Sequence, residues 1–198
     1  MSRTLLMFLA LLAGAGTAFA GATGAPPALK AGGFDPPRMA PDFTLPGSNG
    51  APLKLSAQRG KVVLLAFGYS HCQAVCPVTL STLKMVKKQL GAQAGAIQVV
   101  YVTVDPKRDS APVMQRWLAA FDPAFLGGTG TAAQLAAVRK AYGVSAEDVM
   151  GKMGPDGSMS HSSFVYLIDR QGRLRALMPF GHPAGDYVHD VRVLLAAK

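Results

Sequence analysis

The pattern of apolar residues after residue 40 predicts alternating strands and helices. Residues 61–67 form an almost unbroken apolar run, as expected of a strand buried on both faces. Within 80–90 the apolar residues recur at spacings of three, three and four, with lysines between them, which is the pattern of an amphipathic helix. Residues 97–104 are a second apolar run. The three segments therefore predict a βαβ unit whose two strands are parallel.

The rest of the chain continues this alternation and ends in a hairpin and a helix. Apolar periodicity predicts three further helices, at about 111–121, 132–142 and 184–196. Residues 163–168 and 174–178 are typical of strands, and the glycine-containing segment 169–172 between them is typical of a hairpin turn. The predicted order is thus a βαβ unit, two helices and a ββα unit.

The first 39 residues differ in composition from the rest of the chain. Arg3 precedes a short apolar core and small residues that end in the motif Ala18-Phe19-Ala20, which are the features of a secretory signal peptide. We expect three parts: a signal peptide at 1–20, a flexible linker rich in Gly, Ala and Pro at 21–39, and the folded domain at 40–198. Export predicts a periplasmic protein. The alternative is an uncleaved N-terminal membrane anchor.

The charge of the chain is positive but dispersed. Twenty Lys and Arg residues against 11 Asp and Glu residues give a formal net charge of +9 in 198 residues. The basic residues are scattered, and no Lys/Arg block alternates with aromatic residues, so we expect no nucleic-acid partner. The positive charge instead favours encounter with an acidic partner.

The chemically distinctive residues are the two cysteines of the chain, Cys72 and Cys76, which follow the predicted strand 61–67. Open α/β sheets carry their sites at the carboxyl ends of strands. The next helix begins beside Cys76, where its positive end favours a thiolate. A structural disulfide is the alternative in an exported protein, but it would close a loop too small to add much stability. The pair therefore indicates redox exchange or soft-metal binding.

Redox-type residues at the first strand-to-helix junction of such a chain are typical of the thioredoxin plan. We therefore expect an α/β, thioredoxin-like fold with a central mixed sheet flanked by helices and an extra N-terminal β-hairpin. The cysteine spacing departs from thioredoxin chemistry, which favours two intervening residues, because three residues separate Cys72 from Cys76. The wider spacing allows two thiolates to flank one ion, and soft thiolates select Cu(I), zinc or iron–sulfur centres.

The four histidines are the candidates for a third metal ligand. His189 lies opposite the apolar stripe of the last predicted helix, which indicates a solvated position, and His182 stands just before that helix. His71 adjoins the first cysteine, where it can be a ligand or a neighbour that stabilises the thiolate. His161 follows a flexible glycine-containing stretch and precedes a strand. It is the histidine best placed to fold over the cysteine loop.

The chain resembles the Sco/SenC family of copper-binding, thioredoxin-like proteins from about residue 40 to about residue 195. The resemblance lies in motifs that occur in the family's order: Ala40-Pro41-Asp42-Phe43-Thr44-Leu45, Gly60-Lys61-Val62-Val63-Leu64, Gly68-Tyr69-Ser70-His71-Cys72 with Cys76-Pro77, Val104-Asp105-Pro106-Lys107-Arg108-Asp109, and His161-Ser162 before Tyr166-Leu167-Ile168-Asp169. It implies a membrane-associated or periplasmic copper metallochaperone for the dinuclear copper site of cytochrome c oxidase, or a reductant of the cysteines of that site.

The resemblance also implies a ligand set and partners. It places the family's copper ligands on Cys72, Cys76 and His161, which would hold one copper ion as Cu(I) or Cu(II). The expected partners are the copper-bearing subunit of the oxidase, or another copper acceptor, and a thioredoxin-like reductant. We expect the protein to act as a monomer close to the membrane.

Three positions qualify this resemblance. Asp105 falls on an acidic loop residue of the family, although capping the end of a strand is an equal alternative for it. The family commonly has a proline and an acidic residue between the cysteines, whereas this chain has Gln73 and Ala74. That departure can change the copper affinity or the redox potential without removing a ligand.

Other functions stay open from the residues alone. A thiol-disulfide oxidoreductase would use Cys72 as attacking thiolate and Cys76 as resolving thiol. A peroxide reductase of this fold is expected to carry threonine where Tyr69 stands, and an adaptor without transfer is a further alternative. Thioether sulfur is a soft Cu(I) ligand, so three methionines before the late histidine either pass copper onward or fill space: Met150, Met153 and Met159.

Overall fold

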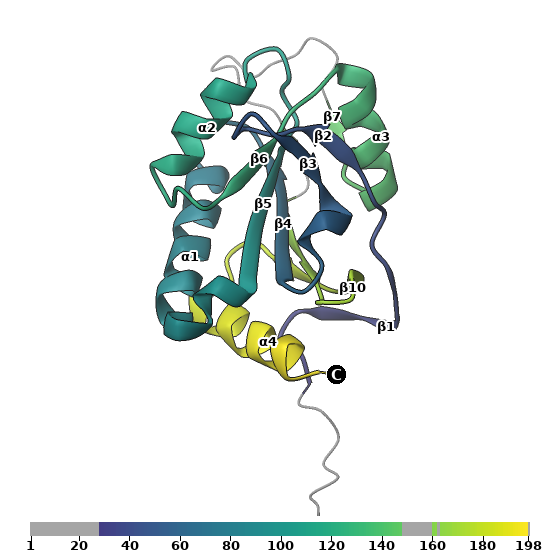
Figure 1. Ribbon diagram of the computed structural model, residues 1–198, viewed down its shortest axis with the longest axis vertical. Helices are drawn as coiled ribbons and strands as arrows, with labels where there is room; N and C mark the ends of the chain where they lie inside the picture. Colours follow the sequence, from purple (N-terminus) through teal and green to yellow (C-terminus); the bar gives the residue numbers. More distant parts are fainter. Residues whose placement is uncertain (1–27, 148–159, 162, 198) are drawn as a thin grey trace, which may run out of the picture.

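A mixed six-stranded sheet forms the centre of the molecule (Figure 1). The computed structural model describes residues 28–147, 160–161 and 163–197. The strands lie in the order β1-β10-β9-β4-β5-β6, with these bounds: Gly32–Met39 for β1, Arg173–Pro179 for β10, Phe164–Ile168 for β9, Val62–Gly68 for β4, Ile97–Thr103 for β5 and Leu126–Gly128 for β6. The strands β4, β5 and β6 are parallel, and β9, β10 and β1 continue the sheet with antiparallel pairing.

Helices flank this sheet: α1 at Val75–Leu90, α2 at Ala111–Ala119, α3 at Ala132–Tyr142 and α4 at Ala184–Ala196. The helices α1 and α4 pack against each other on one face (Figure 1). On the opposite face, Tyr142 of α3 contacts Phe67 of β4, with ring centroids 5.7 Å apart. Because side chains alternate along a strand, the side-chain position of Gly68 faces α1, on the opposite side of the sheet from the Phe67 ring. The end of β4 therefore presents its last residue to the cysteine-bearing helix.

The predicted βαβ unit is confirmed. All residues of β4 and of β5 are buried, and the two strands pair in parallel along their whole length. Pro77 lies in the first turn of α1, where a missing N–H breaks no helical hydrogen bond. The buried face of α1 continues with the four residues of the predicted stripe: Leu80, Leu83, Val86 and Leu90.

The sheet begins earlier than the sequence pattern predicts. Strand β1 lies inside the segment 21–39 that was expected to be a flexible linker, and it pairs with β10. Its side chains are mostly exposed and it contains two prolines, so it has no apolar alternation and is held as an edge strand by backbone pairing. The chain before it is fixed by the buried Asp190 carboxylate, which accepts the N–H groups of Lys30 at 2.7 Å and Ala31 at 2.9 Å. The folded domain thus includes residues before 40.

Smaller elements complete the described fold. The expected N-terminal hairpin is confirmed as an antiparallel pair, β2 and β3. A second short pair, β7 with β8, was not predicted, nor were two short 3-10 helices, η1 and η2. Their bounds are Thr44–Pro46 for β2, Pro52–Lys54 for β3, Ala146–Glu147 for β7, Ser160–His161 for β8, Leu55–Gln58 for η1 and Gly91–Ala96 for η2.

Some sequence-based expectations concern other parts of the chain. The predicted signal peptide at 1–20 and the three methionines at 150, 153 and 159 lie outside the described residues. Within the ranges that the structure describes, no helix combines the length and the apolar character that a membrane crossing needs.

Candidate functional site

The two cysteines lie together where β4 passes into α1. Cys76 is in the first turn of α1 and is buried, whereas Cys72 lies in the preceding loop and is partly exposed. The backbone N–H of Cys76 donates to the Cys72 sulfur over 3.5 Å. Both residues are free thiols in the structure. Cys72 is therefore partly open to solvent, and the buried Cys76 lies behind it at the start of the helix.

The two thiols differ in acidity. Burial raises the pKa of Cys72, but hydrogen bonds from the Cys76, Ala74 and Val75 backbone and from the Cys76 thiol outweigh it and hold the pKa below its ordinary value. Burial raises the pKa of Cys76 to about 12, and a contact with the Tyr101 hydroxyl offsets only part of this rise. Cys72 is thus the thiol prepared to react as a thiolate, while Cys76 stays protonated near neutral pH.

Gly68, the last residue of β4, packs directly against the buried thiol of this site. A Cβ atom at this position would overlap the Tyr101 hydroxyl oxygen and lie 2.8 Å from the Cys76 sulfur. Both atoms therefore lie directly over the Gly68 Cα. Because no side chain fits in this space, glycine is what allows the buried thiol to sit against the end of the sheet.

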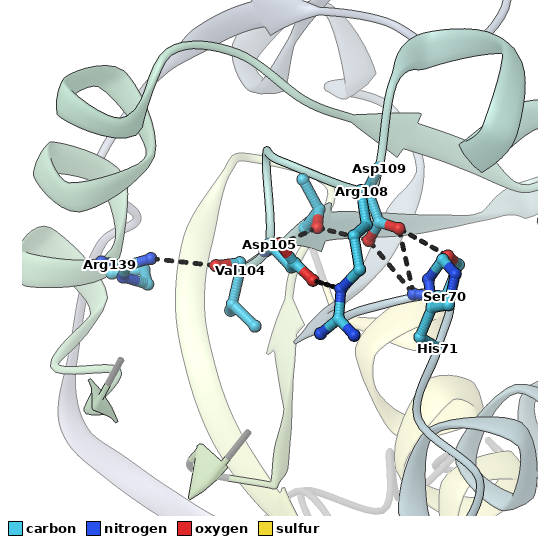
Figure 2. A network of polar contacts seen from close by, with 8 residues as sticks. Ser70, His71, Val104, Asp105, Arg108, Asp109 and Arg139 are labelled. Carbon is cyan, nitrogen blue, oxygen red and sulfur yellow. Dashed lines mark hydrogen bonds and ion pairs between the residues drawn. The ribbon is translucent and has the colours of Figure 1, made fainter. Parts of the chain in front are cut away.

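A polar cluster fixes the loop that carries Cys72 (Figure 2). The Asp109 carboxylate, which is fully buried, accepts the Ser70 hydroxyl, the Ser70 N–H at 3.1 Å and the Thr103 hydroxyl at 2.6 Å. The Thr129 hydroxyl donates in turn to the Asp109 carbonyl over 2.7 Å. The loop after β5 thereby holds the start of the cysteine loop. Asp109 belongs to the motif Val104-Asp105-Pro106-Lys107-Arg108-Asp109. The motif alone did not show that Asp109 holds the cysteine loop.

Asp105 pairs with a neighbour in its own loop. Its carboxylate contacts the Arg108 guanidinium, and its carbonyl accepts the N–H of Arg108 at 3.3 Å and of Asp109 at 3.0 Å. The Arg108 guanidinium also lies over the Tyr69 ring, 5.6 Å from its centroid. These contacts favour the local interpretation of Asp105, which closes the turn after β5, over a direct role at the sulfurs (Figure 2).

Three of the four histidines have described side chains, and each contacts a neighbouring polar residue. His182 contacts Asp186 in the first turn of α4 at 3.0 Å, and His189 contacts its neighbour Asp190 at 2.9 Å. The ring of His71 is exposed and meets the Ser70 hydroxyl at 3.0 Å. The backbone of His161 lies in β8, while its side chain is outside the described atoms.

The chemistry of the donor set fits a soft metal ion. The partly exposed Cys72 and the buried Cys76 bring two sulfur atoms close together. Thiolates are the ligands that Cu(I) prefers. Among the described side chains, no three His, Cys, Asp or Glu residues lie close enough together to hold a metal ion.

Three residues at the site were not singled out from the sequence: Gly68, Tyr101 and Asp109. Gly68 and Asp109 lie in motifs that the sequence analysis identified, but the residues alone did not show what either one does at the site. Tyr101 is hidden in the uniformly apolar run of β5. Only the register of the sheet, which sets Tyr101 beside Ala66, brings it to the site.

The family model SCO1/SenC matches residues 33–196. The mitochondrial SCO2 homolog of Bos taurus is 34% identical over 158 residues, which cover 79% of this chain and 59% of that protein. The chain thus spans about three fifths of the length of the bovine relative.

Solved structures agree with the family match. The structure of Bradyrhizobium japonicum ScoI with copper bound is 31% identical, with a TM-score of 0.70, and the match covers 79% of this chain and 99% of that one. The crystal structure of yeast Sco1 with copper bound is 28% identical, with a TM-score of 0.71 and coverage of 82% and 91%. The predicted thioredoxin-like α/β fold is confirmed, and the chain belongs to the SCO1/SenC family.

Proposed function

We propose that this protein binds one copper ion through Cys72, Cys76 and His161 and delivers it for assembly of the dinuclear copper site of cytochrome c oxidase. The observation that carries the proposal is the pairing of a partly exposed and a buried free thiol at the start of α1. Two soft sulfur donors with one imidazole suit both Cu(I) and Cu(II). Support also comes from the copper-bound structures of related proteins.

Copper loading in this proposal depends on the redox state of the cysteines. Both sulfurs must be reduced and deprotonated to bind metal, so a Cys72–Cys76 disulfide is the empty form. The burial that raises the pKa of Cys76 to about 12 means that copper must displace a proton there, and copper binding releases it to solvent. We further propose that the protein works in the periplasm, where its positive net charge steers it to an acidic acceptor.

A copper titration of the reduced protein tests the ligand set. Wild type is compared with His161→Ala and with His182→Ala, a control whose ring contacts Asp186 in α4. We expect one copper per chain and intense thiolate-to-Cu(II) absorption in wild type and in the control. In His161→Ala the absorption is lost or strongly altered. Equal spectra and affinities in all three proteins would rule out His161 as a ligand.

A thiol-disulfide oxidoreductase is the second candidate, and the asymmetry of the thiols favours it. The lowered pKa of Cys72 suits an attacking thiolate, and Cys76 directly behind it suits the resolving thiol. In that reaction Cys72 attacks a substrate disulfide and expels one thiolate. Cys76 then expels the second, so that two electrons pass to the substrate and the pair becomes a disulfide.

The two functions differ in their need for His161. Catalytic reduction of a disulfide substrate, with a reductant to recycle the pair, is measured for wild type and His161→Ala. Undiminished turnover in His161→Ala, together with no tight copper binding by wild type, would favour the oxidoreductase. Copper binding that requires His161, with turnover no faster than that of a free dithiol, favours the metallochaperone.

A further inference from the structure

Tyr101 carries a buried hydroxyl that lacks an ordinary partner. It is 1% exposed, and among the described residues its hydroxyl makes no hydrogen bond to nitrogen or oxygen. Two other buried tyrosines behave differently: Tyr142 donates to the Pro41 carbonyl at 2.7 Å, and Tyr166 donates to the Tyr142 carbonyl at 2.8 Å. Because an unpaired buried hydroxyl is costly, the exception at Tyr101 calls for an explanation.

The hydroxyl of Tyr101 faces the sulfur of Cys76. Both atoms lie over the Gly68 Cα, since a Cβ there would overlap the hydroxyl oxygen and come within 2.8 Å of the sulfur. Both residues line the same small pocket at the start of α1. On its other side the Tyr101 ring packs edge-on against Trp117, with centroids 5.3 Å apart. The ring is thus held with its polar end directed at one ligand atom.

We propose that Tyr101 is a positioning residue that donates its O–H to the Cys76 sulfur when that sulfur is a copper-bound thiolate. The inference rests on the proposed function, in which Cys76 is a copper ligand. A neutral thiol is a weak acceptor, whereas a thiolate accepts a strong, charge-assisted hydrogen bond. When copper binds, the Cys76 thiol releases its proton to solvent, and Tyr101 keeps its own proton and turns it to the sulfur. The buried hydroxyl therefore gains a strong acceptor in the loaded state, in place of the weak acceptor that a neutral thiol provides.

This role predicts a separation between copper affinity and disulfide chemistry. Neither a neutral thiol nor a disulfide sulfur accepts a strong hydrogen bond, so Tyr101 has little effect on the equilibrium between those two forms. It acts on the copper-thiolate form alone. A tyrosine that only filled space would affect all three forms through the fold.

The test compares Tyr101→Phe with the control Tyr142→Phe in the full chain. Tyr101→Phe keeps the ring against Trp117 and removes only the hydroxyl. We expect its Cu(I) dissociation constant, measured by competition with a chromogenic chelator, to rise roughly tenfold. Its disulfide equilibrium with dithiothreitol at pH 7 changes less than about twofold, because that equilibrium involves no strong acceptor at Cys76. Tyr142→Phe loses a hydrogen bond to Pro41 but keeps its copper affinity.

A spectroscopic readout accompanies the affinities. A hydrogen bond lowers the energy of the sulfur donor orbital, so its loss in Tyr101→Phe shifts the thiolate-to-Cu(II) absorption to longer wavelength, and Tyr142→Phe leaves it in place. Unchanged affinity and absorption in Tyr101→Phe would overturn the inference while the proposed function stands. Parallel losses of copper affinity, disulfide equilibrium and thermal stability would overturn it in favour of a packing role. A wild-type chain that binds no copper would overturn both proposals.

Discussion

Position 68 illustrates how a single side chain limits the candidate site. A methyl group there would overlap the Tyr101 hydroxyl and crowd the Cys76 sulfur. Overpacking of this kind typically costs about 1–3 kcal/mol. We therefore expect Gly68→Ala to lower the free energy of unfolding by that amount and to weaken copper binding, because the buried sulfur must move.

Urea unfolding and chelator competition measure the two effects. Gly95→Ala is the matched control, since a Cβ at Gly95 meets no atom within 4 Å. If Gly68→Ala were as stable as Gly95→Ala and bound copper as tightly, that result would contradict the close packing of Tyr101 and Cys76 against Gly68.

The difference in acidity between the cysteines predicts selective alkylation. Thiolates react and thiols do not. Hydrogen bonds hold the pKa of Cys72 below its ordinary value and burial raises that of Cys76 to about 12. As the pH rises, the labelling rate of Cys72 should therefore reach half its maximum at a lower pH than an ordinary thiol, while Cys76 remains unlabelled.

Iodoacetamide labelling followed by peptide mass spectrometry checks this order. In urea the two cysteines should react at similar rates with an ordinary pH profile, which serves as the control. Faster labelling of Cys76 than of Cys72 in the folded protein would contradict the assigned burial.

At the scale of elements, the loop after β5 holds the cysteine loop in place. The buried Asp109 carboxylate accepts three hydrogen bonds from Ser70 and Thr103. An asparagine has one acceptor oxygen and turns an NH2 group toward donors. Asp109→Asn should lower the free energy of unfolding by about 2 kcal/mol and loosen the loop that carries Cys72.

Thermal or urea unfolding measures the loss, with Asp122→Asn as the control. Asp122 pairs with Lys87 at 2.7 Å and also accepts the Ala124 N–H at 2.8 Å. Because asparagine keeps an oxygen that can accept this N–H, Asp122→Asn should cost less than Asp109→Asn, about 1 kcal/mol. Equal destabilisation by the two substitutions would show that the three hydrogen bonds to Asp109 give it no special role.

The elements differed in how well the sequence predicted them. Long segments with strong periodicity, such as β4, α1 and α4, were predicted to within a few residues, because the spacing of their apolar residues indicates which positions are buried. Strand β6 was missed: it has three residues, two of them glycines that pack closely against neighbouring side chains. Strand β1 was missed because backbone pairing rather than side-chain burial holds it.

For the whole molecule, the sequence located the cysteine pair of the candidate site but not the residues that pack around it. Cys72 and Cys76 were found from their spacing and from their place after a buried strand. Tyr101 was not, because it is distant in sequence and becomes a neighbour of the site only through parallel pairing of β4 with β5. The register of a sheet brings together residues that are far apart in sequence, and no local sequence pattern links such residues.

In the proposed function, two sulfurs and one imidazole of this chain hold one copper ion. Copper-edge X-ray absorption of the reduced, Cu(I)-loaded protein tests it most directly, because it counts the sulfur and nitrogen neighbours of the metal. We predict two sulfur ligands and one nitrogen ligand in wild type and in His182→Ala, and loss of the nitrogen in His161→Ala. A wild-type copper site without nitrogen, or one unchanged by His161→Ala, would contradict this ligand set.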